Sequence, residues 1–396
     1  MRIPSFARAG DLVRMKIRTF LPPRVLAIGT LALTVSTGCA TAGPAASPGS
    51  NAGAASVPTP SVPSSSRPAL ATRWPVRTSA HVDLWLHAFA TIDDQSLLVP
   101  LYRRGYRDSI ATVKNRANVL TSLDANRATL ARRLTVSPGY LQAQFLPFDF
   151  SSWEEMRIAA ERFLQFEGDP RRAPDQQTAA RIAQYAAIFP AAEDREWLRL
   201  FIAGVQDEQV RWFGGEHARV LRARARVINA VDSMWNNSYR TKFERFLNNT
   251  SQRAGDFLLS LPIGGEGRAG SGRERQTVVA VTWPGRVEDA REAILVFAHE
   301  VTGTIVGGVV ADNTTPAQKR DGSGERFVAA GQVRAGAMVL ERVAPELLEP
   351  YQKFYLAHSG IRADGGVAAA FLRTYAIPGA IVDGLQKQIE IILGGI

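Results

Sequence analysis

The chain has 396 residues, with 47 Lys or Arg, 37 Asp or Glu and a single cysteine, and its formal net charge is +10. Six of the basic residues and one acidic residue lie in residues 1–38, so the remainder carries a net charge of only about +5. This small excess does not indicate a nucleic-acid-binding surface, and one cysteine excludes an internal disulfide framework.

Residues 1–38 have the pattern of a secretory signal peptide. Six basic residues flank or precede the apolar segment Val25 to Val35, which is too short to span a bilayer. Small residues follow in the stretch STGCA, where Cys39 comes directly after Gly38. The part that begins at Met15 has ordinary signal proportions by itself, so the start of translation is either Met1 or Met15.

The position of Cys39 resembles the lipobox of bacterial lipoproteins. Ser36 departs from the usual pattern, which has an aliphatic residue three positions before the cysteine. The resemblance implies that Cys39 becomes the lipidated N-terminus and that the membrane is a partner through this lipid. Ala40, in place of Asp, favours the outer membrane, with the chain facing the periplasm. The alternative is a secreted protein with a free thiol.

Residues 39–70 form a predicted tether. This segment is rich in Ala, Ser, Pro and Gly and carries almost no charge or large apolar side chains. It cannot bury enough apolar surface to offset the entropy cost of ordering, which is typical of a flexible linker. We expect the folded body to begin near Trp74.

Residues 71–252 are predicted to be mainly helical. The stretch His81 to Thr91 fits a strand or a helix almost equally well, and we interpret its two histidines, His81 and His87, as structural. Amphipathic spacing from about residue 103 to residue 253 predicts an antiparallel layer of four to six helices, and Ser152 with Glu155 predicts a capping box.

Residues 253–396 have a different composition. Two β-rich runs, Phe257 to Leu261 and Thr277 to Trp283, are separated by a glycine-rich charged loop, which predicts a hairpin with a long connection. An apolar helix containing His299 and Glu300 follows, and then a later helix that carries Glu341 and ends near His358.

This order of elements resembles the gluzincin metallopeptidases over roughly residues 255–360. In such enzymes the HExxH helix supplies two histidines that hold zinc and a glutamate that polarises the zinc-bound water. The resemblance implies that His299 is a metal ligand and that Glu300 is the general base. It implies that Glu341 is the ligand from the later helix, and His358 is a further candidate ligand.

Gly303 departs from this motif, because it stands where the second histidine belongs. His299 and Glu341 are then two protein ligands, whereas catalytic zinc normally takes three. We therefore expect a zincin-like domain that has lost its metal site, needs no cofactor and acts as a binding or structural module for a peptide or an envelope protein. The alternative is an active zinc-dependent peptidase of the cell envelope with an unusual ligand set.

The expected fold class is mainly α, of the α+β type. A helical layer would stand beside a small β-hairpin or sheet and a zincin-like pair of buried helices. Nucleic acid is not an expected partner.

Growth with labelled palmitate should mark the protein, because a lipobox cysteine is acylated after signal cleavage. The substitution Cys39→Ser should abolish the label, while the serine at position 36 can be changed to leucine with the label retained. Unlabelled wild-type protein would contradict the lipoprotein interpretation.

Overall fold

The computed structural model describes residues 73–93, 99–272, 276–362 and 366–394, which belong to one compact unit, residues 68–396. Cys39 and the whole of the predicted tether, residues 39–70, lie outside the described residues.

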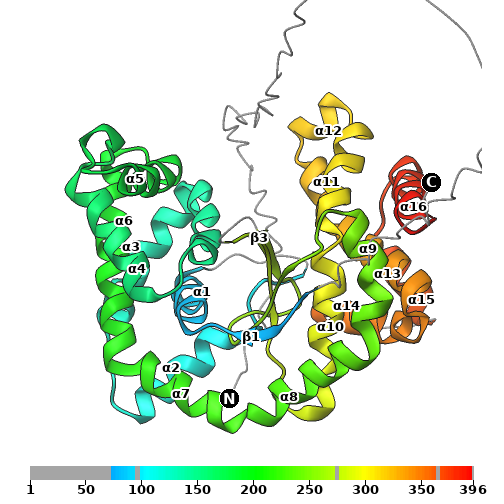
Figure 1. Ribbon diagram of the computed structural model, residues 1–396, viewed down its shortest axis with the longest axis horizontal. Coiled ribbons are helices and arrows are strands. Elements are labelled where there is room, and N and C mark those ends of the chain that lie inside the picture. Colours follow the sequence, from blue (N-terminus) through cyan, green and yellow to red (C-terminus); the bar gives the residue numbers. More distant parts are fainter. Residues whose placement is uncertain (1–72, 94–98, 273–275, 363–365, 395–396) are drawn as a thin grey trace, which may run out of the picture. The chain divides into compact units, whose positions relative to one another are not determined.

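The described part of the chain is mostly helical with one small mixed sheet, so the predicted mainly helical α+β class is confirmed (Figure 1). The elements up to residue 249 are β1 (Val76–Thr78), α1 (Ala80–Ile92), α2 (Tyr106–Arg116), α3 (Ser122–Val136), the 3₁₀ segment η1 (Pro138–Asp149), α4 (Trp153–Gln165), α5 (Gln176–Ile188), α6 (Ala192–Glu208), α7 (Gly214–Ala223), α8 (Ala225–Met234) and α9 (Arg240–Asn249). They are followed by β2 (Gly255–Ser260), β3 (Arg268–Ser271), β4 (Thr277–Thr282), α10 (Arg291–Glu300), α11 (Gly303–Asp312), α12 (Pro316–Arg320), α13 (Ser323–Val343), α14 (Leu348–His358), α15 (Val367–Thr374) and α16 (Gly379–Gly394).

The sheet has the strand order β1-β2-β4-β3, and the predicted hairpin of β2 with β4 is wrong. These two strands are parallel neighbours, with Gly255 opposite Thr277, and β3 pairs antiparallel to the outer side of β4. The reason is visible in the sequence, since both strands are nearly continuous apolar runs, as expected for parallel strands that are buried on both faces.

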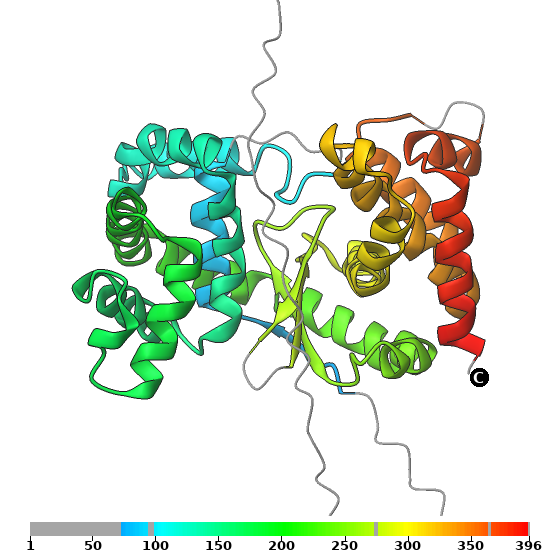
Figure 2. The same ribbon diagram turned by 90° about the horizontal axis from the view of Figure 1, so that it is seen from above.

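Helices cover both faces of this sheet. Phe257, Leu259, Val279 and Val281 pack in one core with α10, and the intervening side chains of β2 and β4 pack in another core with α1. Figure 2 shows the strands between the blue helix α1 and the yellow helices that follow the sheet in the chain. The stretch His81 to Thr91 is therefore a helix, and burial on all sides hid its helical period.

The segment Val287–Asp312, which contains α10 and α11, is apolar and long enough to cross a bilayer, but it is mostly buried in the fold. Every residue from Ala293 to Glu300 is buried, as in the central helix of a globular core. The helix is interrupted at Val301 and Thr302, and α11 begins at Gly303.

Gly307 and Gly308 of α11 mark neither a closely packed backbone nor a break in the helix. Side chains at Gly307 and Gly308 would meet open space, and the helix continues through them. The close approach occurs on the neighbouring helix, where a Cβ at Gly331 of α13 would lie 3.2 Å from Val306.

The helical region before residue 250 has more helices than the expected four to six, because π-helical and turn residues divide the long segment from α6 to α9. The capping box at α4 is half formed. Ser152 accepts a hydrogen bond from the amide of Glu155 at 3.1 Å, but the carboxylate of Glu155 accepts from the amide of Ser151 instead.

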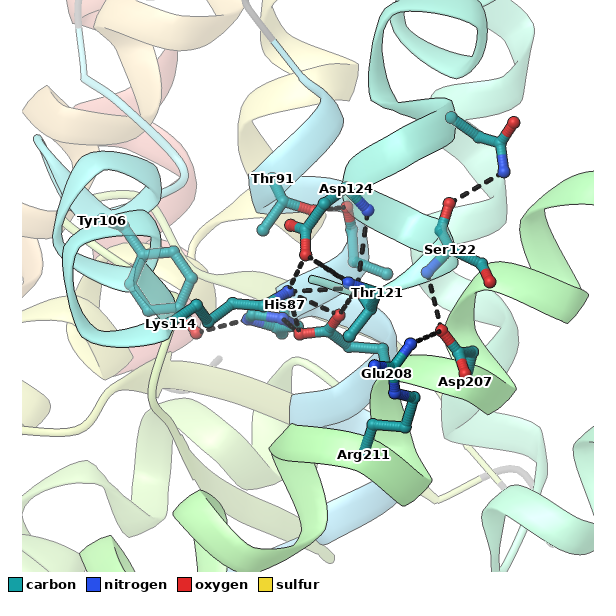
Figure 3. Close-up of polar contacts among 12 residues, drawn as sticks. His87, Thr91, Tyr106, Lys114, Thr121, Ser122, Asp124, Asp207, Glu208 and Arg211 are labelled. Atoms are coloured by element: carbon teal, nitrogen blue, oxygen red, sulfur yellow. Dashed lines mark hydrogen bonds and ion pairs between the residues drawn. The ribbon is translucent and has the colours of Figure 1, made fainter. Parts of the chain in front are cut away.

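A buried polar network joins α1, α2, α3 and α6 (Figure 3). Glu208, at the end of α6, accepts hydrogen bonds from Nζ of Lys114 at 2.8 Å and from Nε2 of His87 at 3.0 Å. Lys114 also bonds the hydroxyl of Thr121 and pairs with Asp124. Nδ1 of His87 is 3.0 Å from the hydroxyl of Tyr106. Each polar group has a partner, so this network is a structural element, and His87 is a buried structural histidine.

The surroundings of Glu208 favour its charged form. Burial raises the pKa of Glu208, but His87 and Lys114 lower it more strongly, and the result is a pKa of about 2. A carboxylate with a lowered pKa in the folded state stabilises the fold above its ordinary pKa, and this contribution is lost as the pH falls from about 4.5 to about 2.

Lys114→Met should lower the free energy of unfolding at pH 7 by about 3–5 kcal/mol, because it leaves the buried charge of Glu208 without its cation. Urea unfolding followed by circular dichroism measures this difference. The control Lys319→Met, at an exposed position of α12, should change the free energy by less than about 0.5 kcal/mol. Equal effects of the two substitutions would contradict a structural role for the network.

Candidate functional site

A cavity of about 470 Å³ lies beside β3 and contains the glutamate of the predicted motif. The sheet contributes β3 and the residues before it, and the helices α10, α11 and α13 contribute the opposite wall. The lining residues are Phe145, Gln252, Glu266, Arg268, Ala269, Gly270, Ser271, Thr277, Glu300, Gly303, Thr304 and Gln332.

Glu300 is the last residue of α10, and only 6% of it is exposed. Its Oε1 accepts hydrogen bonds from the amide of Gly267 at 3.2 Å and from Nε2 of Gln332 at 3.3 Å. The amide of Ala269 also faces this carboxylate and lowers its pKa. Gly267 permits the approach, since a Cβ there would lie 2.5 Å from Cγ of Glu300. The carboxylate is thus held against the backbone of β3.

The amides that hold Glu300 belong to the outer edge of the sheet. The amide of Gly272 donates to the carbonyl of Gln276, so Gly272 and Gln276 are a hydrogen-bonded pair of the antiparallel ladder. Such pairs alternate along the strand. In the register of β3 with β4, the amides of Gly267, Ala269 and Ser271 therefore point away from β4. Glu300 takes the first two positions, and Ser271 is exposed.

Burial and charge make Glu300 a carboxyl group that titrates near neutral pH. Burial, followed by the charge of Glu266, raises its pKa to about 7, while Arg268 and the two amides act in the opposite direction. Arg268 is also paired with Glu266 at 2.6 Å, so its charge is shared between the two carboxylates. A change of pH around 7 therefore changes the charge inside the cavity.

His299 is buried next to this cavity in its neutral form. Burial, followed by the charge of Arg268, lowers its pKa to about 3. Its Nε2 lies 3.6 Å from Oε1 of Glu300, and its ring contacts the ring of Tyr355 with centroids 5.1 Å apart. Hydrogen bonds satisfy the carboxylate of Glu300, whereas Nδ1 of His299 has no hydrogen-bond partner among the described residues.

The other candidate ligands do not join His299. The expected single later helix is two helices, α13 and α14, because Pro345 interrupts it. Glu341 is exposed on α13, nine residues after Gln332, which places it about 13 Å further along the helix from the residue that contacts Glu300. Nδ1 of His358 bonds the carbonyl of Phe354, and its ring packs on the ring of Phe354.

The donor set around His299 does not fit a catalytic zinc ion. Gly303 offers no ligand, and the described residues include no group of three His, Cys, Asp or Glu side chains placed to hold a metal. The carboxylate of Glu300 is also engaged by backbone amides.

Several residues of the site were missed in the sequence. Gly267, Arg268 and Glu266 lie in the glycine-rich charged stretch that we interpreted as a hairpin connection, and Gln332 and Tyr355 had no distinguishing pattern. The one available signal was the density of glycines before a short polar segment, which indicates a close approach to a backbone.

Comparison of the chain with protein-family models, with curated proteins and with solved structures finds no match.

Protein purified without chelators should carry well under one zinc ion per chain, because the described residues gather no set of three ligands around His299 and fewer ligands hold zinc too weakly to survive purification. Elemental analysis by mass spectrometry measures the metal content of the wild type and of His299→Ala. Stoichiometric zinc in the wild type that disappears in His299→Ala would overturn this prediction.

Proposed function

We propose that this chain is a cell-envelope lipoprotein whose zincin-like body acts as a binding module for an extended peptide. Lipid at Cys39 anchors it to the membrane, with the body facing the periplasm from the outer membrane. The bound peptide lies in the cavity beside β3. One observation carries the proposal, namely that outward amides of the edge strand β3 line a cavity and bind the carboxylate of Glu300.

An edge strand with outward amides is a template for strand addition. A peptide in extended conformation can pair with such an edge through its backbone and place alternate side chains in adjoining pockets. β3 has β4 on one side only in the described sheet order. A peptide would begin to pair with β3 at its exposed end, Ser271. Further along the strand the carboxylate of Glu300 already occupies the position of a peptide carbonyl.

The cavity walls supply polar contacts for such a ligand. Gln252 and Gln332 offer amide groups, and Glu266 with Arg268 offers one charge of each sign. Phe145 adds an aromatic surface beside the strand. Backbone pairing would provide affinity, and these side chains would provide selectivity among peptides.

A metal-dependent peptidase is the alternative function. The pKa of Glu300, near 7, suits a general base, and its helix lies beside an edge strand. The donor set argues against it, since neither Glu341 nor His358 lies with His299.

Ser271→Pro tests the proposal because it removes an outward amide while leaving the pairing of β3 with β4 intact. Peptides selected from a random displayed library on the wild type are titrated by calorimetry. Their affinity should fall at least about tenfold in Ser271→Pro and stay within about twofold in the matched control Ser271→Ala, which keeps the amide.

Peptides that bind the wild type and Ser271→Pro equally well would exclude strand addition at β3. A selection that enriches no peptide would exclude the proposed function itself.

A further inference from the structure

A second cavity lies at the start of α1 and shares no lining residue with the cavity beside β3. Its volume is about 490 Å³. It is lined by Arg77, Thr78, Ser79, His81, Val82, Pro147, Phe148, Phe150, Ser151, Asp256, Leu258, Gln276 and Val278. Ser79 and His81 therefore border the same space.

Ser79 and His81 are in hydrogen-bond contact. Oγ of Ser79 is 2.9 Å from Nδ1 of His81, and Nε2 of His81 is 3.1 Å from the carbonyl oxygen of Pro147. Pro147 belongs to η1, which is 66 residues further along the chain. A tertiary contact thus fixes the ring, and the pair is more than a local contact within the first turn.

The Pro147 carbonyl determines which nitrogen of His81 carries the proton. A carbonyl oxygen can only accept, so Nε2 donates to it. In the neutral ring Nδ1 then has a lone pair, and the hydroxyl of Ser79 donates to that nitrogen. Burial lowers the pKa of His81, although the carbonyls of Pro147 and Phe150 raise it, so the neutral ring predominates at pH 7. This is the arrangement of a serine with its general base.

Ser79 occupies the N-cap position of α1 without capping the helix. Its side chain makes no hydrogen bond to a backbone amide of the first turn. The first helical hydrogen bond runs from the amide of Asp83 to the carbonyl of Ser79, so the amides of residues 80–82 have no acceptor within the helix. These amides directly follow Ser79 in the chain, and free amides in the first turn of a helix are suitable donors for an oxyanion.

We propose that Ser79 and His81 form a nucleophile and general-base pair that hydrolyses short-chain carboxylic esters. The Ser79 hydroxyl gives its proton to Nδ1 of His81 as Oγ attacks the ester carbonyl carbon. The tetrahedral intermediate collapses, the bond to the leaving oxygen breaks, and His81 returns the proton so that an alcohol departs. Water then gives a proton to His81 and attacks the acyl-serine. The acid is released as His81 reprotonates Oγ of Ser79.

The surroundings of His81 favour esters over amides. A backbone carbonyl orients the ring, and it stabilises the imidazolium of the transition state less than a carboxylate would. An oxygen leaving group needs less help from the acid than an amine. The apolar side chains of Val82, Phe148, Leu258 and Val278 line the cavity and fit a short acyl chain.

The test uses the full chain, a fluorophosphonate probe and p-nitrophenyl butyrate. Mass spectrometry should find the probe on Ser79, and Ser79→Ala should abolish both labelling and ester hydrolysis. His81→Asn should lower both rates at least about 100-fold, as for the loss of a general base. The exposed control Ser109→Ala should match the wild type.

A probe adduct on another residue, such as Ser151 in the same cavity, would overturn the proposal, and so would hydrolysis by Ser79→Ala at the wild-type rate. Ser79→Ala removes no cap bond, so it should fold and keep the outcome decisive if His81→Asn does not fold. The proposal is independent of peptide binding, and Ser271→Pro should retain full esterase activity.

Discussion

A carboxylate that is buried at the end of a core helix must find hydrogen-bond donors, and Glu300 finds them in the backbone of β3. The rest of the site depends on this constraint. Gly267 has no side chain because Glu300 lies against it, β3 stays close to α10, and Gln332 reaches across from α13 to the same carboxylate. A buried carboxylate without these donors would cost several kcal/mol of folding free energy. The side chain of Glu300 therefore couples β3, α10 and α13.

The same constraint bears on the metal site that the resemblance to metallopeptidases implies. In such enzymes the glutamate activates a water on zinc, which requires a free carboxylate and three protein ligands. Here the carboxylate accepts a hydrogen bond from a backbone amide, Nδ1 of His299 has no partner within the part of the chain that the structure describes, and Gly303 offers no ligand to a metal. An edge strand that already binds an oxygen acceptor offers the same kind of donor that a peptide backbone needs.

Much of the secondary structure could be predicted from local signals. The helix α4 has an amphipathic period, α10 is a continuous apolar run, and both have acidic residues in the first turn. Tertiary contacts decided the remainder. The helix α1 is buried on all sides, so its sequence shows no amphipathic period. The sheet order could not be predicted, because the strand β3 lies inside a glycine-rich stretch that has no strand pattern. Glu300 was predictable from its motif, whereas Gln332, Tyr355 and the Ser79–His81–Pro147 contact come together only in the fold.

Glu300 should titrate near neutral pH while its carboxylate lies against the amides of β3. Proton–nitrogen NMR of protein labelled at glycine and alanine tests it directly. The amide protons of Gly267 and Ala269 should move downfield with a midpoint near pH 7 as Glu300 ionises and its hydrogen bonds strengthen. Glu300→Gln should abolish the titration, and Glu266→Gln should shift its midpoint to lower pH. Amide shifts that stay constant from pH 5.5 to 8.5, or that titrate equally in Glu300→Gln, would contradict the account.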